Sequence, residues 1–298
     1  MREPANLEAC TDRHAIASGN ASHAGAFGRS TSGVCRVMST NSFYPAAAAR
    51  FIADAHAARQ PYRNLAGSLE PPTIADAYAV QDELRKLWEP LHGPVAGLKI
   101  AVTTKVMQEL MGIDHPCGGM IYARNIHSAP HKLEMDRYMH VVLEFELAVR
   151  VGRTLAKKAT PWSREEVRVE ISEVMPAFEL IEDRNAVYKE TRPTTLIADN
   201  AWNAGIVLGK PVTVSPSFEL NGLAGRLTTP AGMREGRTDD PMGALAWCVN
   251  LAADRGRPLE AGQVVITGSV IPTLPIALGE TFRFELEGLG SIEISGTT

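Results

Sequence analysis

Val141-Val-Leu-Glu-Phe-Glu-Leu-Ala-Val-Arg-Val151 is a run in which every second residue is apolar. This spacing and the many β-branched residues predict a β-strand with one unbroken apolar face packed into a core. On the opposite face, Glu144 and Glu146 are neighbours that point the same way. Val142 and Ala148 lie on that face too, which indicates that the two carboxylates are partly buried.

Two neighbouring carboxylates repel each other unless a proton or a cation lies between them. Solvated charges on an exposed strand are the ordinary explanation for such a pair, but partial burial would make uncompensated carboxylates costly. Glu179 is the expected third member, because it lies in another apolar, strand-like run. Three carboxylates without Cys or His form an all-oxygen site, which favours Mg²⁺ or Mn²⁺. Spacing alone leaves open whether the two strands meet.

Composition excludes several classes of protein. The 298 residues are 45% hydrophobic and 21% charged, as in a soluble globular protein. A net charge of -4 gives no electrostatic reason to expect nucleic acid or an anionic membrane as a partner. No apolar run approaches the roughly 18 residues that span a bilayer. The four cysteines have no CxxC spacing, which argues against a disulfide framework or a zinc site and fits a reducing cytoplasm.

The two ends of the chain differ in character. Residues 1–43 are predicted to be a disordered extension, since the stretch is rich in Ala, Ser and Gly without an apolar period. A start codon at Met38 is the alternative, and a transit peptide is disfavoured by Glu3, Glu8 and Asp12. Residues 44–298 are expected to form one domain, with a helical part over about 44–95.

Periodicity and capping residues predict the elements of that domain. Thr73, with Asp76 three residues on, marks the start of a helix that ends before Gly93. Ser163 marks a helix running to about Val174. Other expected elements are helices over 45–60, 105–112 and 241–253, strands over 97–104, 120–126, 139–151, 175–184, 204–208, 262–269, 281–286 and 291–294, a loop over 112–119, and a polar surface or lid loop over 185–198.

Five short motifs occur in a characteristic order: Gly97-Leu-Lys-Ile100, Glu144-Phe-Glu146, Pro176-Ala-Phe-Glu-Leu-Ile-Glu-Asp-Arg184, Asp199-Asn200 and Thr267-Gly-Ser269. Each alone is loose, but together they resemble the fumarylacetoacetate hydrolase superfamily over about residues 45–298. Within it, the chain is similar to the branch of 2-keto-4-pentenoate hydratases and 4-oxalocrotonate decarboxylases. The resemblance implies an α+β fold, in which a mixed β-sandwich or roll like the fumarylacetoacetase C-terminal domain follows an N-terminal helical segment.

The resemblance also implies roles for single residues. Glu144, Glu146 and Glu179 would bind Mg²⁺ or Mn²⁺, and Lys99 matches the active-site lysine. Without the resemblance, Lys99 could equally be a surface lysine whose stem lies along apolar neighbours. Ser269 would line the substrate pocket. Arg184 and Asn200 would contribute to substrate binding, either directly or by holding the groups that do.

One loop departs from the family's pattern. Cys117 stands where many members carry an aspartate, in Asp114-His-Pro-Cys-Gly-Gly119. Asp114 is therefore the expected catalytic acid or base, with His115 as an alternative. Cys117 is expected to be a packing residue, because no adjacent base would activate its thiol. The His-Glu pair of the superfamily's hydrolases is not recognisable here, since His127 and His131 lack its context.

The expected activity is that of a metal-dependent hydratase (a hydro-lyase). It would add water to a short unsaturated 2-oxo acid, of the 2-hydroxypenta-2,4-dienoate type, in aromatic-compound catabolism. A decarboxylase of 4-oxalocrotonate-type 2-oxo-dicarboxylates and a non-catalytic partner subunit are the alternatives. A homo-oligomer is expected, with a complex with a paralogous decarboxylase or hydratase as a further possibility.

Overall fold

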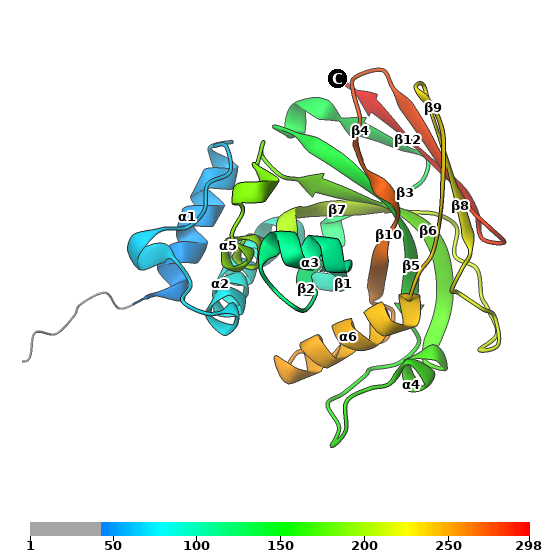
Figure 1. The fold of residues 1–298 in the computed structure, drawn as a ribbon, viewed down its shortest axis with the longest axis horizontal. Coiled ribbons are helices and arrows are strands. Elements are labelled where there is room, and N and C mark those ends of the chain that lie inside the picture. Colours follow the sequence, from blue (N-terminus) through cyan, green and yellow to red (C-terminus); the bar gives the residue numbers. More distant parts are fainter. Residues whose placement is uncertain (1–42) are drawn as a thin grey trace, which may run out of the picture. The chain divides into compact units, whose positions relative to one another are not determined.

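The computed structural model describes residues 43–298 (Figure 1). The extension expected over residues 1–43 and the alternative start at Met38 fall outside this range, except for Phe43. Two helices open the described part, α1 (Pro45–Ala57) and α2 (Ile74–His92). The Thr73 side chain accepts a hydrogen bond from the Asp76 amide, and α2 ends at Gly93, as its capping residues predict. No helix within 43–298 is long and apolar enough to cross a membrane.

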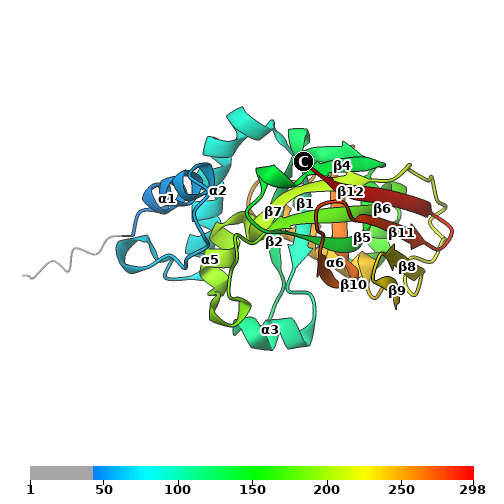
Figure 2. The same ribbon diagram turned by 90° about the horizontal axis from the view of Figure 1, so that it is seen from above.

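The strands form two sheets. The larger sheet has the order β2-β1-β10-β5-β6-β7-β3, and the smaller has the order β4-β12-β11-β8-β9. Figures 1 and 2 show α1 and α2 at one end and β8 and β9 at the other. The strands are β1 (Val95–Ala101), β2 (Cys117–Tyr122), β3 (Ile126–Ser128), β4 (His131–Glu134), β5 (Val141–Val151), β6 (Ile171–Glu182), β7 (Asn203–Leu208), β8 (Ala224–Thr229), β9 (Gly232–Arg237), β10 (Val264–Pro275), β11 (Thr281–Leu286) and β12 (Gly290–Thr297), and the remaining helices are α3 (Lys105–Met111), α4 (Arg164–Arg168), α5 (Pro193–Ala198) and α6 (Pro241–Asp254).

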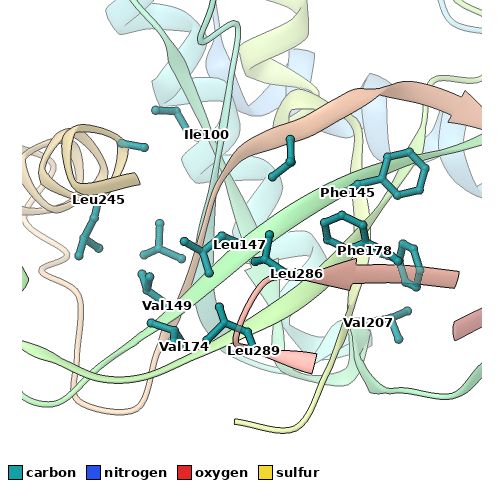
Figure 3. Close-up of a cluster of buried hydrophobic side chains, with 14 of the residues drawn as sticks. Ile100, Phe145, Leu147, Val149, Val174, Phe178, Val207, Leu245, Leu286 and Leu289 are labelled. Atoms are coloured by element: carbon teal, nitrogen blue, oxygen red, sulfur yellow. The ribbon is translucent and has the colours of Figure 1, made fainter. Parts of the chain in front are cut away.

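The main core lies between the two sheets and α6 (Figure 3). The apolar face of β5 enters it as the alternation predicts, and Phe145 is fully buried. Its ring centroid lies 5.9 Å from that of Phe178 on β6 and 5.8 Å from that of Phe284 on β11. Leu245 of α6 closes the core at one side. Because this face is buried, the glutamates of β5 must point to the opposite side of the larger sheet.

Several of the predicted elements were wrong in extent or type. The helix from Ser163 ends at Arg168, because the following residues join β6 and pair with β5. Within the predicted loop over 112–119, the last three residues belong to β2. The expected surface loop over 185–198 contains α5, whose Leu196 and Ile197 are buried. The strand begun at Val264 continues through its prolines to Pro275, along a β5 ladder with several register shifts. In each case long-range pairing or burial overrides the local signal.

Candidate metal and substrate site

Antiparallel pairing of β5 with β6 brings the three predicted metal ligands together. Glu144 is directly opposite Glu179 in the ladder, so their side chains lie on the same face. Glu146 follows on that face two residues along β5. One carboxylate oxygen from each residue lies within 4.8 Å of those of the other two. The question left open by sequence spacing is therefore answered, because the two strands do meet at these residues.

Lys99 reaches the same site from β1, with Nζ 3.1 Å from Glu179 Oε1. The lysine is 2% exposed, so it is not a surface lysine. It is paired with Gly119 of β2, and a Cβ at Gly119 would lie 3.0 Å from Lys99 Cγ and 2.5 Å from the Asn200 carbonyl oxygen. Gly119 therefore leaves room for the lysine side chain to pass.

Each glutamate is held by one neutral donor. The Gly268 amide donates to Glu146 Oε2 over 2.6 Å, with Gly268 at a φ of +111° that favours glycine. Asn203 Nδ2 donates to Glu179 Oε1 over 2.9 Å, and the Thr273 hydroxyl donates to Glu144 Oε1 over 2.8 Å. Glu146 Oε1 and Glu179 Oε2 are buried and have no hydrogen-bond partner among the described residues. Buried carboxylate oxygens without a partner are costly, so they indicate a missing positive charge.

The pKa values of the site's ionisable groups also indicate that a positive charge is missing. Burial raises the pKa of Glu179 to about 7 in spite of the opposing Lys99. Burial, with Glu144 and Glu179 beside it, raises the pKa of Glu146 well above its usual range. Burial acts to lower the pKa of Lys99, but Glu179 and Glu144 outweigh it and raise this pKa to about 12. With the three carboxylates ionised and Lys99 protonated, two negative charges remain unbalanced.

A hard divalent cation fits these groups. The donors are all carboxylate oxygens, as Mg²⁺, Mn²⁺ and Ca²⁺ prefer. Their mutual separation suits oxygens placed around one ion at about 2.0–2.6 Å. Two of the oxygens have no other partner, and two positive charges would balance the excess carboxylate charge. The residues present are therefore compatible with the metal that the sequence predicts.

A cavity of about 450 Å³ opens beside these carboxylates. Ser269 lines this cavity, and its hydroxyl accepts from the Phe145 amide and donates to the Ile271 carbonyl oxygen. The rest of the lining is mostly apolar. The lining residues are Lys99, Ile100, Ala101, Val102, Thr103, Thr104, Met107, Met111, Glu144, Ile181, Tyr188, Leu196, Ala201, Trp202, Gly268, Ser269, Val270, Ile271, Pro272 and Thr273.

Arg184 and Asn200 are not brought to this cavity. Arg184 pairs with Asp199 over 2.5 Å and donates to the Gln60 carbonyl oxygen. Asn200 exchanges two hydrogen bonds with the backbone of Met120, of 2.6 and 2.9 Å, which tie it to β2. In this structure both side chains support the walls of the site instead of facing a ligand.

The loop before β2 does not supply the expected acid or base either. Asp114 is exposed and does not line the cavity. His115 Nδ1 lies 2.7 Å from the Pro116 carbonyl oxygen. Cys117 is fully buried, and burial raises the pKa of its thiol to about 12, as befits a packing residue. Asp114 as the catalytic acid or base stays a prediction that this geometry does not support.

Several polar residues of the site were not anticipated. Tyr188 lines the cavity, and its hydroxyl donates to Asp183 Oδ2 over 3.0 Å. His140 Nδ1 lies 2.7 Å from the other oxygen of Asp183. Asn203 and Thr273, which hold the glutamates, were missed as well. The one available signal was Tyr188 itself, an aromatic residue in an otherwise polar segment.

Comparison with known proteins gives these features a context. The sequence model for the fumarylacetoacetate (FAA) hydrolase C-terminal family matches residues 119–295. A 2-hydroxyhexa-2,4-dienoate hydratase of Comamonas testosteroni is 30% identical over 76% of this chain and 87% of its own length. The 2-keto-4-pentenoate hydratase 2 of Dechloromonas aromatica is 27% identical over 86% of this chain and 98% of its own.

A solved structure resembles the whole described part of the chain. The 4-oxalocrotonate decarboxylase from Pseudomonas putida G7, complexed with magnesium and adipate, superposes with a TM-score of 0.77. It covers 85% of this chain and 97% of its own, at 24% identity. At that identity the likeness establishes the fold, and it confirms the predicted arrangement of curled mixed sheets behind N-terminal helices.

Proposed function

This chain belongs to the fumarylacetoacetate hydrolase C-terminal family, and we propose that it is a metal-dependent hydratase of a short unsaturated 2-oxo acid. The substrate would be of the 2-hydroxypenta-2,4-dienoate type, in the catabolism of aromatic compounds. One observation carries the proposal: three carboxylates, two of which have a buried oxygen without a partner, lie beside a buried lysine at one side of a cavity of about 450 Å³. The names of the two hydratase relatives support this activity over the others that the family performs.

In this proposal, Glu144, Glu146 and Glu179 hold Mg²⁺ or Mn²⁺. When bound, such an ion acts as a Lewis acid on the carboxylate and 2-oxygen of a chelating 2-oxo acid. The protein's part is to keep the three ligands in place through Gly268, Asn203 and Thr273, and to keep water away by burying two of them.

Lys99 would orient the substrate's carboxylate or transfer a proton. Because its pKa is raised, it stays protonated at neutral pH, which suits anion binding better than proton transfer. A 2-hydroxy-2,4-dienoate must gain a proton at its far carbon and lose the proton of its 2-hydroxyl to become a conjugated 2-oxo acid, to which water then adds. Tyr188 is our candidate for that proton transfer, since its hydroxyl is held by Asp183 at the cavity wall.

A substrate panel tests this function. The protein is incubated with Mg²⁺ and 2-hydroxypenta-2,4-dienoate, and loss of the dienol's ultraviolet absorbance is followed while the product is identified. A hydratase gives the 4-hydroxy-2-oxo acid. Release of CO₂ from 4-oxalocrotonate would instead establish the decarboxylase alternative. Absence of turnover with every 2-oxo acid, metal present, would favour a non-catalytic partner subunit.

Organisation beyond the site stays a proposal. We expect residues 44–298 to be the catalytic domain, so a chain that begins at Tyr44 should keep full activity. We also expect a homo-oligomer in the cytoplasm, and we include a complex with a paralogous decarboxylase or hydratase in the proposal. Sedimentation of the purified protein tests its self-association, and co-purification with a co-expressed paralogue tests the complex.

A further inference from the structure

The cavity's lining bears on which 2-oxo acids it accepts. We propose that it selects a 2-oxo acid with an uncharged far end, that is a monocarboxylate, and discriminates against a dicarboxylate of equal length. The inference rests on the proposed function only in that a 2-oxo acid is taken to be anchored at the glutamates and Lys99. This choice separates substrates of the 2-hydroxypenta-2,4-dienoate type from dioates such as 4-oxalocrotonate.

The charged residues that line the cavity disfavour a second carboxylate on the ligand. Lys99 is the single basic residue among those that line the cavity within residues 43–298. It already lies 3.1 Å from Glu179, so it serves the end where the 2-oxo acid is anchored. Glu144, the other charged lining residue, is negative. A second carboxylate on the ligand would therefore meet no cation and would be repelled by the glutamates.

One wall of the cavity is hydrophobic. Val102, Met111, Ile181, Leu196, Ala201 and Trp202 belong to one hydrophobic cluster, and Met107 packs against it. All seven of these side chains also line the cavity. A hydrocarbon tail gains by contact with this wall, whereas a carboxylate would lose its hydration there without a replacement.

The hydroxyl groups of the lining do not replace the hydration that a second carboxylate would lose. The Tyr188 hydroxyl already donates to Asp183, whose buried carboxylate adds a negative charge behind the wall. Thr104 accepts the Met107 amide at the start of α3. The lysines nearest in sequence, Lys105 and Lys189, are exposed and do not line the cavity. The wall therefore offers a carboxylate no cation, and its one buried side-chain donor without a partner among the described residues is the neutral Trp202 Nε1.

A matched pair of ligands tests the proposal by binding, independently of turnover. Calorimetry with Mg²⁺ compares 2-oxohexanoate with 2-oxoadipate, which have the same chain length and differ in the terminal group. In parallel, kcat/KM is compared for 2-hydroxyhexa-2,4-dienoate and 2-hydroxyhexa-2,4-dienedioate. We expect the monocarboxylate to be favoured at least about 100-fold in each comparison. Equal or tighter binding of 2-oxoadipate would overturn the inference.

These readouts separate the inference from the proposed function. If neither dienoate is turned over but 2-oxohexanoate still binds more tightly than 2-oxoadipate, the hydratase proposal fails and the inference stands. If both dienoates are hydrated equally well and both oxo acids bind equally, the hydratase proposal stands and the inference fails.

Variants then locate the discrimination. Met107→Arg places a cation on the half-buried side of α3. It should reduce the ratio of the affinities for 2-oxohexanoate and 2-oxoadipate by at least about tenfold. Met107→Gln, which has a side chain of similar length without a charge, should leave this affinity ratio unchanged. Thr103→Arg, at an exposed lining position, repeats the test where packing demands are small. Failure of both arginine variants to reduce this affinity ratio would overturn the assignment to this wall.

Discussion

Among the buried carboxylates of residues 43–298, Asp199 and the pair of Glu146 and Glu179 lie in two charged clusters that are balanced in opposite ways. Asp199 is 1% exposed, yet each of its carboxylate oxygens contacts a basic side chain. Arg184 lies 2.5 Å from one oxygen and His56 Nε2 lies 2.7 Å from the other. Burial acts to raise the pKa of Asp199, but His56 and Arg184 outweigh it and lower this pKa. Glu146 and Glu179 are buried as deeply. Among the described residues, Lys99 is the one basic side chain beside their cluster of three carboxylates, and the pKa values of Glu146 and Glu179 are raised.

The difference separates a structural carboxylate from a ligand carboxylate. Where the protein supplies both the charge and the hydrogen bonds, as at Asp199, the group closes a network among α1, α5 and the turn after β6. Where buried oxygens stay without partners, as at Glu146 and Glu179, the balance has to come from outside the chain. Burial alone does not distinguish the two, whereas the direction of the pKa does.

Removing a glutamate from the metal cluster should have the largest effect. We expect Glu146→Gln to lower kcat/KM with Mg²⁺ at least about 1,000-fold, which is about 4 kcal/mol in the activation barrier. The metal-free variant should be at least as stable as the wild type, since one repelling charge is gone. Steady-state kinetics and calorimetric Mg²⁺ titration measure this. Glu173→Gln, at a half-exposed pair with Arg150, is the control. Unchanged activity of Glu146→Gln would remove the proposed site.

Removing the cation from the other cluster should act on stability instead. Arg184→Met leaves Asp199 without one buried partner and should lower the free energy of unfolding by about 3–5 kcal/mol. Urea unfolding measures it, and Arg192→Met, which breaks the exposed pair with Glu70, should cost about 0–1 kcal/mol. Mg²⁺ affinity of the folded variant should not change. A loss of Mg²⁺ affinity equal to that of Glu146→Gln would erase the distinction between the clusters.

Adding the metal should stabilise the protein through the first cluster only. At an Mg²⁺ concentration 100 times the Kd, the free energy of unfolding should rise by about 2.7 kcal/mol. The rise should vanish in Glu146→Gln and persist in Arg192→Met. Thermal or urea unfolding with and without a chelator gives the measurement. Equal stabilisation of wild type and Glu146→Gln would assign the effect to a different metal site.

The two clusters should also respond to pH with opposite signs. The pKa of Glu179 is raised in the folded state from 4.5 to about 7, so its stabilising contribution in the metal-free protein is present below pH 4.5 and is lost as pH rises to about 7. The contribution of Asp199 is present above its unfolded pKa and is lost as pH falls through its lowered folded pKa.

Urea unfolding of metal-free wild type and Glu179→Gln across pH 4.5–8 separates these contributions. The difference between the two free energies of unfolding should fall by on the order of 2 kcal/mol as pH rises, because only the wild type can ionise at this position. Saturating Mg²⁺ should abolish the fall. A difference that grows with pH would mean that Lys99 alone balances Glu179.

Local patterns were enough for the strand of β5 and for the helix of α2. The alternation from Val141 to Val151 depends only on which face is buried, and the Thr73 cap depends on residues three apart. Local patterns failed where distant segments decided the outcome. The polar residues after Arg184 predicted a surface loop, but packing against α2 and β2 buries Leu196 and Ile197 in a helix.

Ordered motifs and period-two alternation can be read along the chain, so they predicted the family, most strands of the larger sheet, and Glu144, Glu146, Glu179 and Lys99 as site residues. The three-dimensional fold was needed to show that Glu144 faces Glu179, that Lys99 is buried, and that Gly268, Asn203 and Thr273 hold the carboxylates. It also decided that Arg184 and Asn200 support the walls and that Tyr188 lines the cavity. Strand register and the pairing of a charge with its counter-charge join residues that lie more than 100 positions apart, such as Gly97 with Val264 and His56 with Asp199, and no local pattern encodes them.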